Sequence, residues 1–454
     1  MDMLKLKERP YFTPNDPEFM GADDSESIQN AVDKAHELGV NQVVIPRING
    51  RTGETAWYIQ RTIKLPSNMT VKLDNCYMEQ CQSAYCQMFT NSLAHEQESK
   101  LPENEEHDIR ILGIGNVTLS GGKPNGLLER TSGRNGLPSI WRNHIIYFHN
   151  ASNIVIENIR VREQRWWGIT FLFCHHVRLS NIDISVIPHV SNQDGIDLRR
   201  GCNNFIIENI TGRSGDDTVA LTNISNAYEE LWAVQGADPD THDIVIRNIK
   251  SDSNYCFPLR LLNHDGNRMY NITIDGIYDV SKPENKQKPG AAVSIGSALY
   301  WSHRPGKLGE TRNISVSNIS SRGEAAVLIS NTLADAYFTN IKTFSDNTDV
   351  IKTLGPVAVL KNVVVDGVFS ETNQVNMADD TPYEKPTGSI LNLAEATGGE
   401  NIIVRNVFAK TMGTAFNLGR DVKVEAENIN IDTLTTMAKL GEGCSLTLDG
   451  EDVK

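Results

Sequence analysis

Residues 175–184 read HHVRLSNIDI, and variants of this segment recur along the chain. Each copy has a polar start, alternating apolar residues that are mostly β-branched, and an Asn or Asp before the next turn. The other copies begin at residues 152, 203, 242, 270, 312, 361 and 400. Their aligned polar residues are Asn158, Asn181, Asn209, Asn248, Asp275, Asn318, Asp366 and Asn406.

This repeat predicts strand-turn-strand coils stacked on one another. Alternation gives each strand one buried and one solvated face, and stacked coils share a core that a single coil cannot form. The two-residue period excludes helical repeats, and the shortest spacing, from 158 to 181, is below the roughly 40–45 residues of a propeller blade. Asn at a corner tolerates left-handed backbone and can hydrogen-bond to its copies. We therefore expect an all-β fold, a right-handed single-stranded parallel β-helix.

Residues 21–46, GADDSESIQNAVDKAHELGVNQVVIP, differ from the repeats and predict a helix of about 13 residues followed by a strand. Asp23 or Asp24 can cap the helix, and Gly39 can end it. An amphipathic helix here would cover the open end of the first coil, as solenoids require. Its apolar face would consist of Ile28, Val32, Ala35 and Leu38.

The organisation of the chain predicts one domain, because no linker separates the repeats. Within residues 1–454 we expect a cap and first strand in 1–50, coils in 51–440 and a C-terminal tail in 441–454. The acidic segment 92–108, SLAHEQESKLPENEEHD, is expected to be a solvated excursion.

The charge and cysteine content exclude several classes of partner. A formal net charge of −14 argues against nucleic acid or an anionic membrane. Seven scattered cysteines favour buried thiols over a disulfide framework or a metal site, and we expect no cofactor.

The N-terminus lacks the apolar core of a signal peptide, and no segment reaches the roughly 18 apolar residues of a membrane span. We expect a cytoplasmic protein, or a secreted one if the sequence is trimmed; homo-oligomerisation is left open.

Acidic residues interrupt good strand sequence at two places, Asp194 in SNQDGIDL and the pair Asp216-Asp217 in SGDDTVAL. Asp is a poor strand former, so these positions need a reason. The 22 residues from 194 to 216 match one short coil, which would place the two carboxylates on adjacent strands, about 4.8 Å apart along the stack. If Ile196 faces the core, a bend at Gly195 must turn Asp194 outward.

Three carboxylates on one face repel one another, so we expect at least one to have a raised pKa. A protonated carboxyl beside ionised ones suits cleavage of a glycosidic bond, because one group protonates the leaving oxygen while the others activate water. Two other interpretations fit the same spacing: acidic residues without a function on a solvent-exposed face of the β-helix, or a set of calcium ligands.

The motifs NQDGID (192–197) and SGDDTVAL (214–221) resemble the polygalacturonase-type glycoside hydrolases of family 28, within the pectin-lyase-like β-helix superfamily. That family carries Asn-Thr-Asp-Gly-Ile-Asp and then a Gly-Asp-Asp-Cys-Val-Ala-Ile-like strand. The resemblance implies that Asp216 is the general acid and that Asp194 and Asp217 activate the attacking water. It also implies inversion at the anomeric carbon.

The chain departs from the family one coil further on, where the family has a Gly-His-Gly strand. Aligning Leu259 with Val219 puts Phe257 in the place of that histidine. Ser294 and Gly296 occupy the place of an Arg-x-Lys pair that grips a galacturonate carboxylate in the family. The sequence therefore does not predict the pair of basic residues with which the family grips a uronate carboxylate at this place.

Polar and aromatic side chains near these motifs are candidates for holding a sugar. Arg260 lies between core leucines, so we expect it to point outward and either orient a neutral sugar or replace the clamp for an acidic one. An aromatic ring can stack on the C–H face of a pyranose. The predicted substrate-binding residues are Asn192, Arg260, His264, Trp301, Tyr255 and Trp167.

These features predict a glycoside hydrolase acting on an oligo- or polysaccharide, pectin-related or from another plant or microbial source. Exo-action is one option, because inserts at 223–241 and 281–311 could close one end of a cleft. One alternative is a calcium-dependent, pectate-lyase-like polysaccharide lyase with Arg260 as the base. Another is a glycan-binding β-helix without catalysis.

Overall fold

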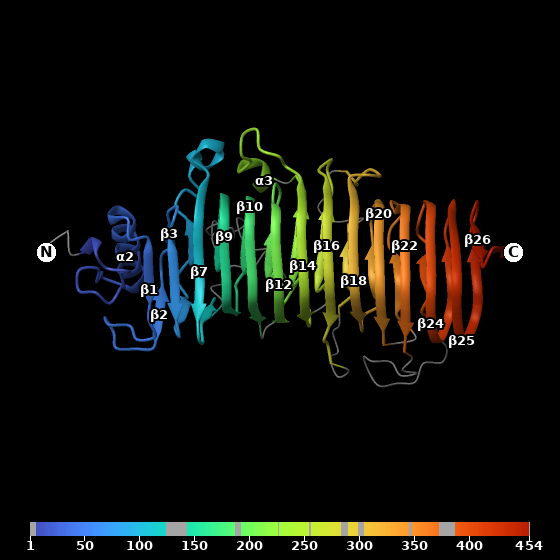
Figure 1. Cartoon of the computed structure of the whole chain (residues 1–454), viewed down its shortest axis with the longest axis horizontal. Helices are drawn as coiled ribbons and strands as arrows, with labels where there is room; N and C mark the ends of the chain where they lie inside the picture. Colours follow the sequence, from blue (N-terminus) through green and yellow to red (C-terminus); the bar gives the residue numbers. More distant parts are fainter. Residues whose placement is uncertain are drawn as a thin grey trace. The chain divides into compact units, whose positions relative to one another are not determined.

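The computed structural model describes residues 6–123, 143–186, 192–225, 227–253, 256–282, 289–297, 304–344, 347–371 and 386–453. The chain forms two compact units. Unit 1 comprises Met1–Asp216 and Tyr228–Asp238, and unit 2 comprises Asp217–Ala227 and Pro239–Lys454. Each unit is built mainly of parallel β-strands (Figure 1). The expectation of a single domain over 1–454 stays a prediction.

Unit 1 stacks its strands coil on coil. Ile146, Ile169 and Ile196 pair in register on three successive coils, and all three are fully buried. The elements of unit 1 are α2 (Asp24–Leu38), β1 (Gln42–Ile45), β2 (Ala56–Ile59), β3 (Ile63–Leu65), β4 (Thr70–Asp74), β5 (Tyr77–Gln80), β6 (Phe89–Asn91), η1 (Gln97–Lys100), η2 (Pro102–Asn104), β7 (Glu106–Ile114), β8 (Thr118–Ser120), β9 (Ile146–Arg162), β10 (Ile169–Ser185), β11 (Ile196–Leu198), β12 (Asn203–Arg213) and, except for its first residue, α3 (Ala227–Leu231).

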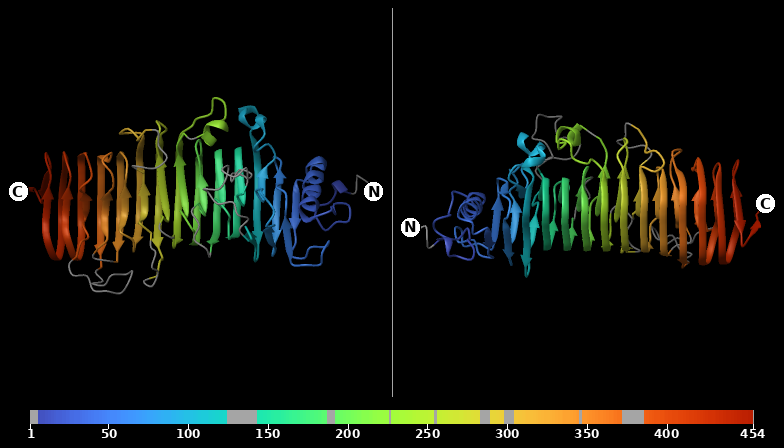
Figure 2. Two further views of the ribbon diagram at one scale, coloured as in Figure 1. Left: turned by 180° about the vertical axis from the view of Figure 1, so that it is seen from behind. Right: turned by 45° about the horizontal axis from the view of Figure 1, so that its top comes forward.

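Helix α2 lies beside the first strands of unit 1 (Figures 1 and 2). The Asp23 side chain caps it by accepting a hydrogen bond from the backbone N–H of Glu26. Gly39 ends it with a φ of 71°, a conformation that glycine adopts without a steric penalty. The predicted capping helix is confirmed, and its buried residues include Ile28, Val32, Ala35 and Leu38.

Unit 2 has the same kind of architecture, and Figure 2 shows its strands from two further directions. Val219 pairs with Leu259, and Leu259 pairs with Val293, so the alignment of these strands is confirmed. The elements of unit 2 are β13 (Val219–Asn223), β14 (Thr241–Ser251), β15 (Leu259–Asn263), β16 (Met269–Asp279), β17 (Ala291–Ile295), β18 (Thr311–Ser321), β19 (Ala325–Ile329), β20 (Leu333–Thr343), β21 (Asp349–Thr353), β22 (Val359–Ser370), β23 (Leu391–Leu393), β24 (Gly398–Leu418), β25 (Val422–Leu440), β26 (Ser445–Leu448) and β27 (Glu451–Asp452). The predicted fold class, an all-β parallel β-helix with an N-terminal helix, is confirmed.

The corners of the coils explain the repeated asparagines. Asn158, Asn181 and Asn209 all adopt left-handed backbone, with φ between 55° and 60°. Asn181 Nδ2 donates to Asn158 Oδ1 over 3.0 Å, and Asn209 Nδ2 donates to Asn181 Oδ1 over 3.1 Å. The side-chain amides therefore form the predicted ladder, in which the amide of each corner asparagine donates a hydrogen bond to the amide oxygen of the corner before it.

The polar alignment is wrong by one residue at Asp275 and Asp366. In the strand register the corner positions there belong to Gly276 and Gly367, with φ values of 84° and 76°. Glycine lacks a Cβ and takes left-handed backbone more readily than aspartate, so the corner moves to it. The Asp275 carboxylate still joins the ladder, because Asn318 Nδ2 donates to it over 2.5 Å.

The acidic segment 92–108 is solvated in part, as expected, since Glu96, Glu98 and Glu103 are exposed, but part of it is packed. The Glu106 carboxylate is buried and accepts hydrogen bonds from Asn91 Nδ2 and from the backbone N–H of Leu93, both at 2.8 Å. The Lys100 carbonyl accepts from the backbone N–H of Gln235, also at 2.8 Å. The Glu106 carboxylate and the Lys100 carbonyl therefore have hydrogen-bond partners within the protein, where the sequence predicted contact with water.

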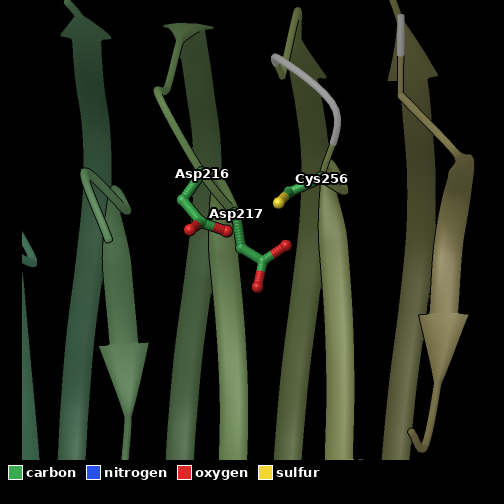
Figure 3. A group of neighbouring side chains, drawn as sticks. All are labelled: Asp216, Asp217 and Cys256. Carbon is green, nitrogen blue, oxygen red and sulfur yellow. The ribbon is translucent and has the colours of Figure 1, made fainter. Parts of the chain in front are cut away.

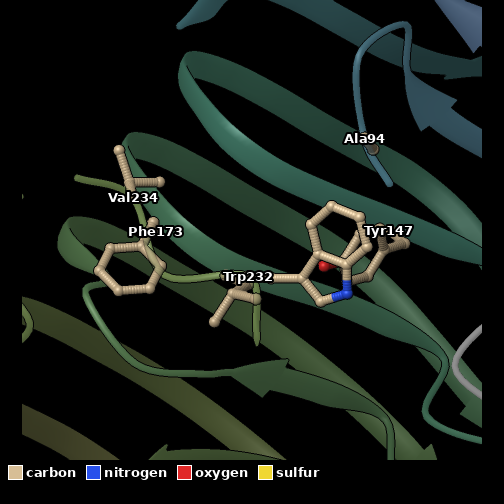
Figure 4. Packing of buried hydrophobic residues seen from close by; sticks show 6 residues of the cluster. Ala94, Tyr147, Phe173, Trp232 and Val234 are labelled. Carbon is tan, nitrogen blue, oxygen red and sulfur yellow. The ribbon is translucent and has the colours of Figure 1, made fainter. Parts of the chain in front are cut away.

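Residues 228–238, which begin within α3, pack their apolar side chains onto the strands of unit 1. We call this segment the α3 insertion. Together with residues of β9, β10 and the 92–108 segment it forms a buried cluster (Figure 4). The members are Ala94, Tyr147, Leu172, Phe173, Trp232 and Val234. The insertion is therefore a packed part of unit 1.

His149 joins this insertion to the 92–108 segment. Its Nε2 lies 2.8 Å from the Trp232 carbonyl, so Nε2 carries the proton of the neutral ring, and its Nδ1 lies 2.9 Å from Ser99 Oγ. Burial lowers the pKa of His149 from 6.5 to about 4. Protonation of His149 in the unfolded chain, while the folded protein keeps the ring neutral, lowers the free energy of unfolding.

The free energy of unfolding should therefore be highest above pH 6.5 and fall as the pH drops from 6.5 towards 4, because only the unfolded chain gains the proton there. The total loss from His149 is about 3 kcal/mol. Denaturant unfolding of the wild type and of His149→Gln, at pH 7.5 and 4.5, measures it by difference. An equal pH dependence in the two proteins would contradict this assignment.

Candidate active site

Asp194 lies in the bend that leads into β11. The chain bends at Gly195, as predicted, so the alternation of the strand is broken just before Ile196. The Asp194 carbonyl accepts a hydrogen bond from the backbone N–H of Gly168 on the preceding coil, over 3.0 Å. A Cβ on Gly168 would lie 2.7 Å from the Gly195 carbonyl oxygen, so only glycine allows this approach. The bend is thus fixed by two glycines on neighbouring coils.

Two buried glutamines hold the backbone at Asp194. Gln193 Nε2 donates to the Gln164 carbonyl over 2.9 Å, and Gln164 Nε2 donates to the Asp194 carbonyl over 3.0 Å. Sequence reasoning missed both residues, although Gln193 stands directly before Asp194 in the NQDGID motif. Since both side chains are buried, this pair restrains the carboxyl-bearing loop.

Asp216 lies beside the same loop within unit 1. The backbone N–H of Asn192 donates to Asp216 Oδ2 over 2.8 Å, and that of Gly215 donates to the Gln193 carbonyl over 3.0 Å. Ser214 Oγ donates to the Asp216 carbonyl over 2.7 Å. Asp216 is half-buried, and one of its carboxyl oxygens is held by a backbone donor of the first motif.

Trp167, predicted to stack on a sugar, is only 6% exposed. The Arg199 guanidinium carbon lies 4.2 Å from the centroid of the indole ring and covers one of its faces. The indole Nε1–H donates to Asn192 Oδ1 over 3.2 Å. Asn192 therefore contacts both Trp167 and Asp216 within unit 1.

Asp217 belongs to unit 2 and is buried. Its Oδ1 accepts from the backbone N–H of Phe257 over 3.1 Å, and its Oδ2 lies 3.2 Å from Arg260 Nη1. The Arg260 side chain is 19% exposed, so water screens this ion pair only partly. A backbone donor and a cation both favour the ionised form of a carboxylate.

A carboxylate oxygen of Asp217 lies within 4.8 Å of Cys256 Sγ (Figure 3), a spacing at which the two groups could share a metal ion. Figure 3 also shows Asp216, the residue before Asp217. A metal would compete with Phe257 and Arg260 for Asp217, and calcium prefers oxygen ligands to sulfur. Asp217 and Cys256 therefore do not favour a calcium site.

His264 is fully buried in unit 2 rather than placed on a surface. Its Nδ1 lies 3.0 Å from Asn331 Nδ2, and its Nε2 accepts from the backbone N–H of Ser297 over 3.2 Å. Burial lowers the pKa of His264, which favours the neutral ring. These contacts suit a residue that supports a loop; sugar binding by His264 stays a prediction.

Ser294, which the sequence analysis placed at the position of the family's clamp, pairs with Arg260 in the strand register and so lies next to it on the following coil. Tyr255 and Trp301 lie outside the described residues.

Comparison with known proteins finds similarity to the family that the motifs resemble. Residues 56–236 match the family model "Glycosyl hydrolases family 28", so the predicted resemblance is confirmed over this part of the chain. The Aspergillus flavus protein "Putative galacturan 1,4-alpha-galacturonidase A" is 24% identical over 264 residues, which are 52% of this chain and 57% of that protein. The chain thus matches little more than half the length of this relative.

Two solved structures share the fold. The family 28 exopolygalacturonase of Yersinia enterocolitica is 13% identical, with a TM-score of 0.53, over 98% of this chain and 79% of that one. A tailspike protein mutant of E. coli bacteriophage HK620 is 12% identical, with a TM-score of 0.61, over 97% of this chain and 80% of that one. At such identities the likeness establishes the fold alone. Among the described residues, no helix combines the length and apolar character needed to cross a membrane.

Proposed function

We propose that this protein is a glycosidase that hydrolyses a pectin-related glycan or another plant or microbial oligo- or polysaccharide. The match to glycosyl hydrolases family 28 and the similarity to a galacturonidase relative support the reaction class. The observation that carries the proposal is the hydrogen bond from Asn192 N–H to Asp216 Oδ2, because it joins the two motifs on which the family resemblance rests.

In the proposed mechanism Asp216 gives its proton to the leaving glycosidic oxygen. Asp194 and Asp217 orient a water molecule and accept its proton as the water attacks the anomeric carbon. The contacts of Asp217 with Phe257 N–H and Arg260 support an ionised carboxylate, which the basic role requires. A single displacement by water inverts the anomeric configuration.

The pairing of Arg260 also bears on the substrate. A guanidinium engaged by a protein carboxylate is less available to grip a uronate, and Ser294 on the next coil offers no charge. We therefore propose a pectin-related substrate whose sugar is not held by a uronate clamp at this position. Exo-action on short chains is part of this proposal.

The lyase alternative needs Arg260 to lose a proton. Arginine stays protonated in proteins, and the adjacent Asp217 carboxylate stabilises the charged form further. The same ion pair therefore favours hydrolysis over elimination.

Incubation with a panel of pectic and other plant oligosaccharides, with a chelator present, tests the proposal. We expect new reducing ends without the ultraviolet absorbance of an unsaturated uronide. Loss of activity on chelation, or an unsaturated product, would instead support the lyase.

A further inference from the structure

We propose that Trp167 is a positioning residue for Asp216 and not a sugar-stacking platform, and that the buried Arg199–Glu229 pair holds Trp167 in place. This inference rests on the proposed role of Asp216 as the general acid. It assigns a purpose to the α3 insertion, since that segment supplies Glu229.

The contacts form a continuous chain within unit 1. Trp167 Nε1–H donates to the Asn192 side-chain oxygen over 3.2 Å. The backbone N–H of Asn192 donates to Asp216 Oδ2 over 2.8 Å. A shift of the indole would therefore move Asn192, and with it the donor that orients the Asp216 carboxyl.

Arg199 and Glu229 extend this series of contacts on the side of Trp167 away from Asn192. Their side chains are 6% and 0% exposed, and Arg199 Nε donates to Glu229 Oε1 over 2.8 Å. The Arg199 guanidinium lies on the face of the Trp167 ring at 4.2 Å, within the range of a cation–π contact. A buried ion pair is weak evidence for stability, because desolvation offsets the attraction, but it fixes geometry. The pair therefore suits a positioning role.

The chain also specifies which oxygen of Asp216 is the acid. Because Asn192 N–H donates to Oδ2, that oxygen acts as an acceptor, and in the proposed role the proton is given from Oδ1. On cleavage this proton moves to the leaving glycosidic oxygen as the glycosidic bond breaks, and water forms the new bond to the anomeric carbon while it loses a proton to the carboxylate base. Asp216 becomes a carboxylate, and the Asn192 N–H bond strengthens as negative charge develops on its acceptor.

Two variants remove the same link by different routes. Trp167→Phe keeps an aromatic ring but loses the N–H donor. Asn192→Gly loses the side-chain acceptor but keeps the backbone N–H, and glycine adopts the φ of 64° at this position without strain. Each should lower kcat on an oligosaccharide by about 10- to 100-fold with KM unchanged, because the acid is misplaced rather than the sugar released. The double variant should be no slower than the worse single variant, since both remove one interaction.

Trp166→Phe is the matched control. Trp166 is also buried, and its Nε1 has no hydrogen-bond partner among the described residues. It should therefore keep the kcat of the wild type. Thermal unfolding of all four variants shows whether any loss of kcat reflects loss of folded protein.

An aryl glycoside with an acidic phenol as its leaving group separates positioning from general damage. Such a leaving group needs no proton, so Trp167→Phe should approach wild-type kcat on it. A rise in KM at unchanged kcat on the oligosaccharide, or an equal loss on both substrates, would overturn the inference. A wild type that hydrolyses neither substrate would refute the proposed function itself.

Discussion

Replacing Asp216 by Asn is expected to lower kcat for glycoside hydrolysis by about 10²- to 10⁴-fold, with little change in KM. The amide has nearly the same size and can still accept the Asn192 N–H bond, but it cannot give a proton to the leaving oxygen. Steady-state kinetics on the best oligosaccharide of the panel measure the effect.

The matched control for this variant is Asp335→Asn. Asp335 lies at a coil corner with a φ of 52°, where Asn is equally suited, and its Oδ1 accepts from Asn362 Nδ2 as an amide oxygen would. It should leave kcat unchanged. Full turnover by Asp216→Asn would exclude Asp216 as the acid, and glycan binding without turnover in the wild type would favour the non-catalytic alternative.

Replacing Arg260 by Met should lower kcat by about 10- to 100-fold, because the Asp217 carboxylate loses the cation that holds it in place. Arg260→Lys keeps a positive charge and should lose less kcat than Arg260→Met, although kcat still falls because a lysine lacks the planar donor geometry. Steady-state kcat and KM for the three proteins measure both effects.

The sequence predicts that Arg260 contacts the sugar, and that role would give a different kinetic result. Loss of a clamp on a sugar carboxylate would raise KM while leaving kcat unchanged. Removing one partner of a buried ion pair also destabilises a protein, by about 3–5 kcal/mol in fully buried cases. The double variant Arg260→Met with Asp217→Asn, which leaves no uncompensated charge, should recover part of that stability but none of the activity.

Much of the fold could be predicted because its determinants are local and repeated. The two-residue alternation fixes the strands, and the Asp23 cap and Gly39 end fix α2. The error at Asp275 arose because the left-handed residue is the glycine in an Asp-Gly corner but the asparagine itself in the other corners, a choice set by backbone strain. Composition did not reveal the packed part of the 92–108 segment, because it does not show internal hydrogen-bond partners such as those of Glu106.

The sequence points to catalytic candidates only where it interrupts its own pattern. Asp194 and Asp216 stand out because carboxylates break good strand sequence, and their catalytic role stays a prediction. The residues packed around them do not stand out: Arg199 and Glu229 lie 30 residues apart, and Glu229 belongs to an insertion with no repeat pattern. A sequence does not show which face of a ring is covered, so it could not reveal that Arg199 lies over Trp167; sugar binding by Trp167 stays a prediction.

The central claim is that a carboxyl acid and carboxylate bases direct a single displacement by water. Proton NMR of the first product formed from the hydrolysed oligosaccharide, recorded before mutarotation, tests this claim most directly. The account predicts that the new reducing end first has the anomeric configuration opposite to that of the bond cleaved. A product that first carries the configuration of the original bond would contradict it.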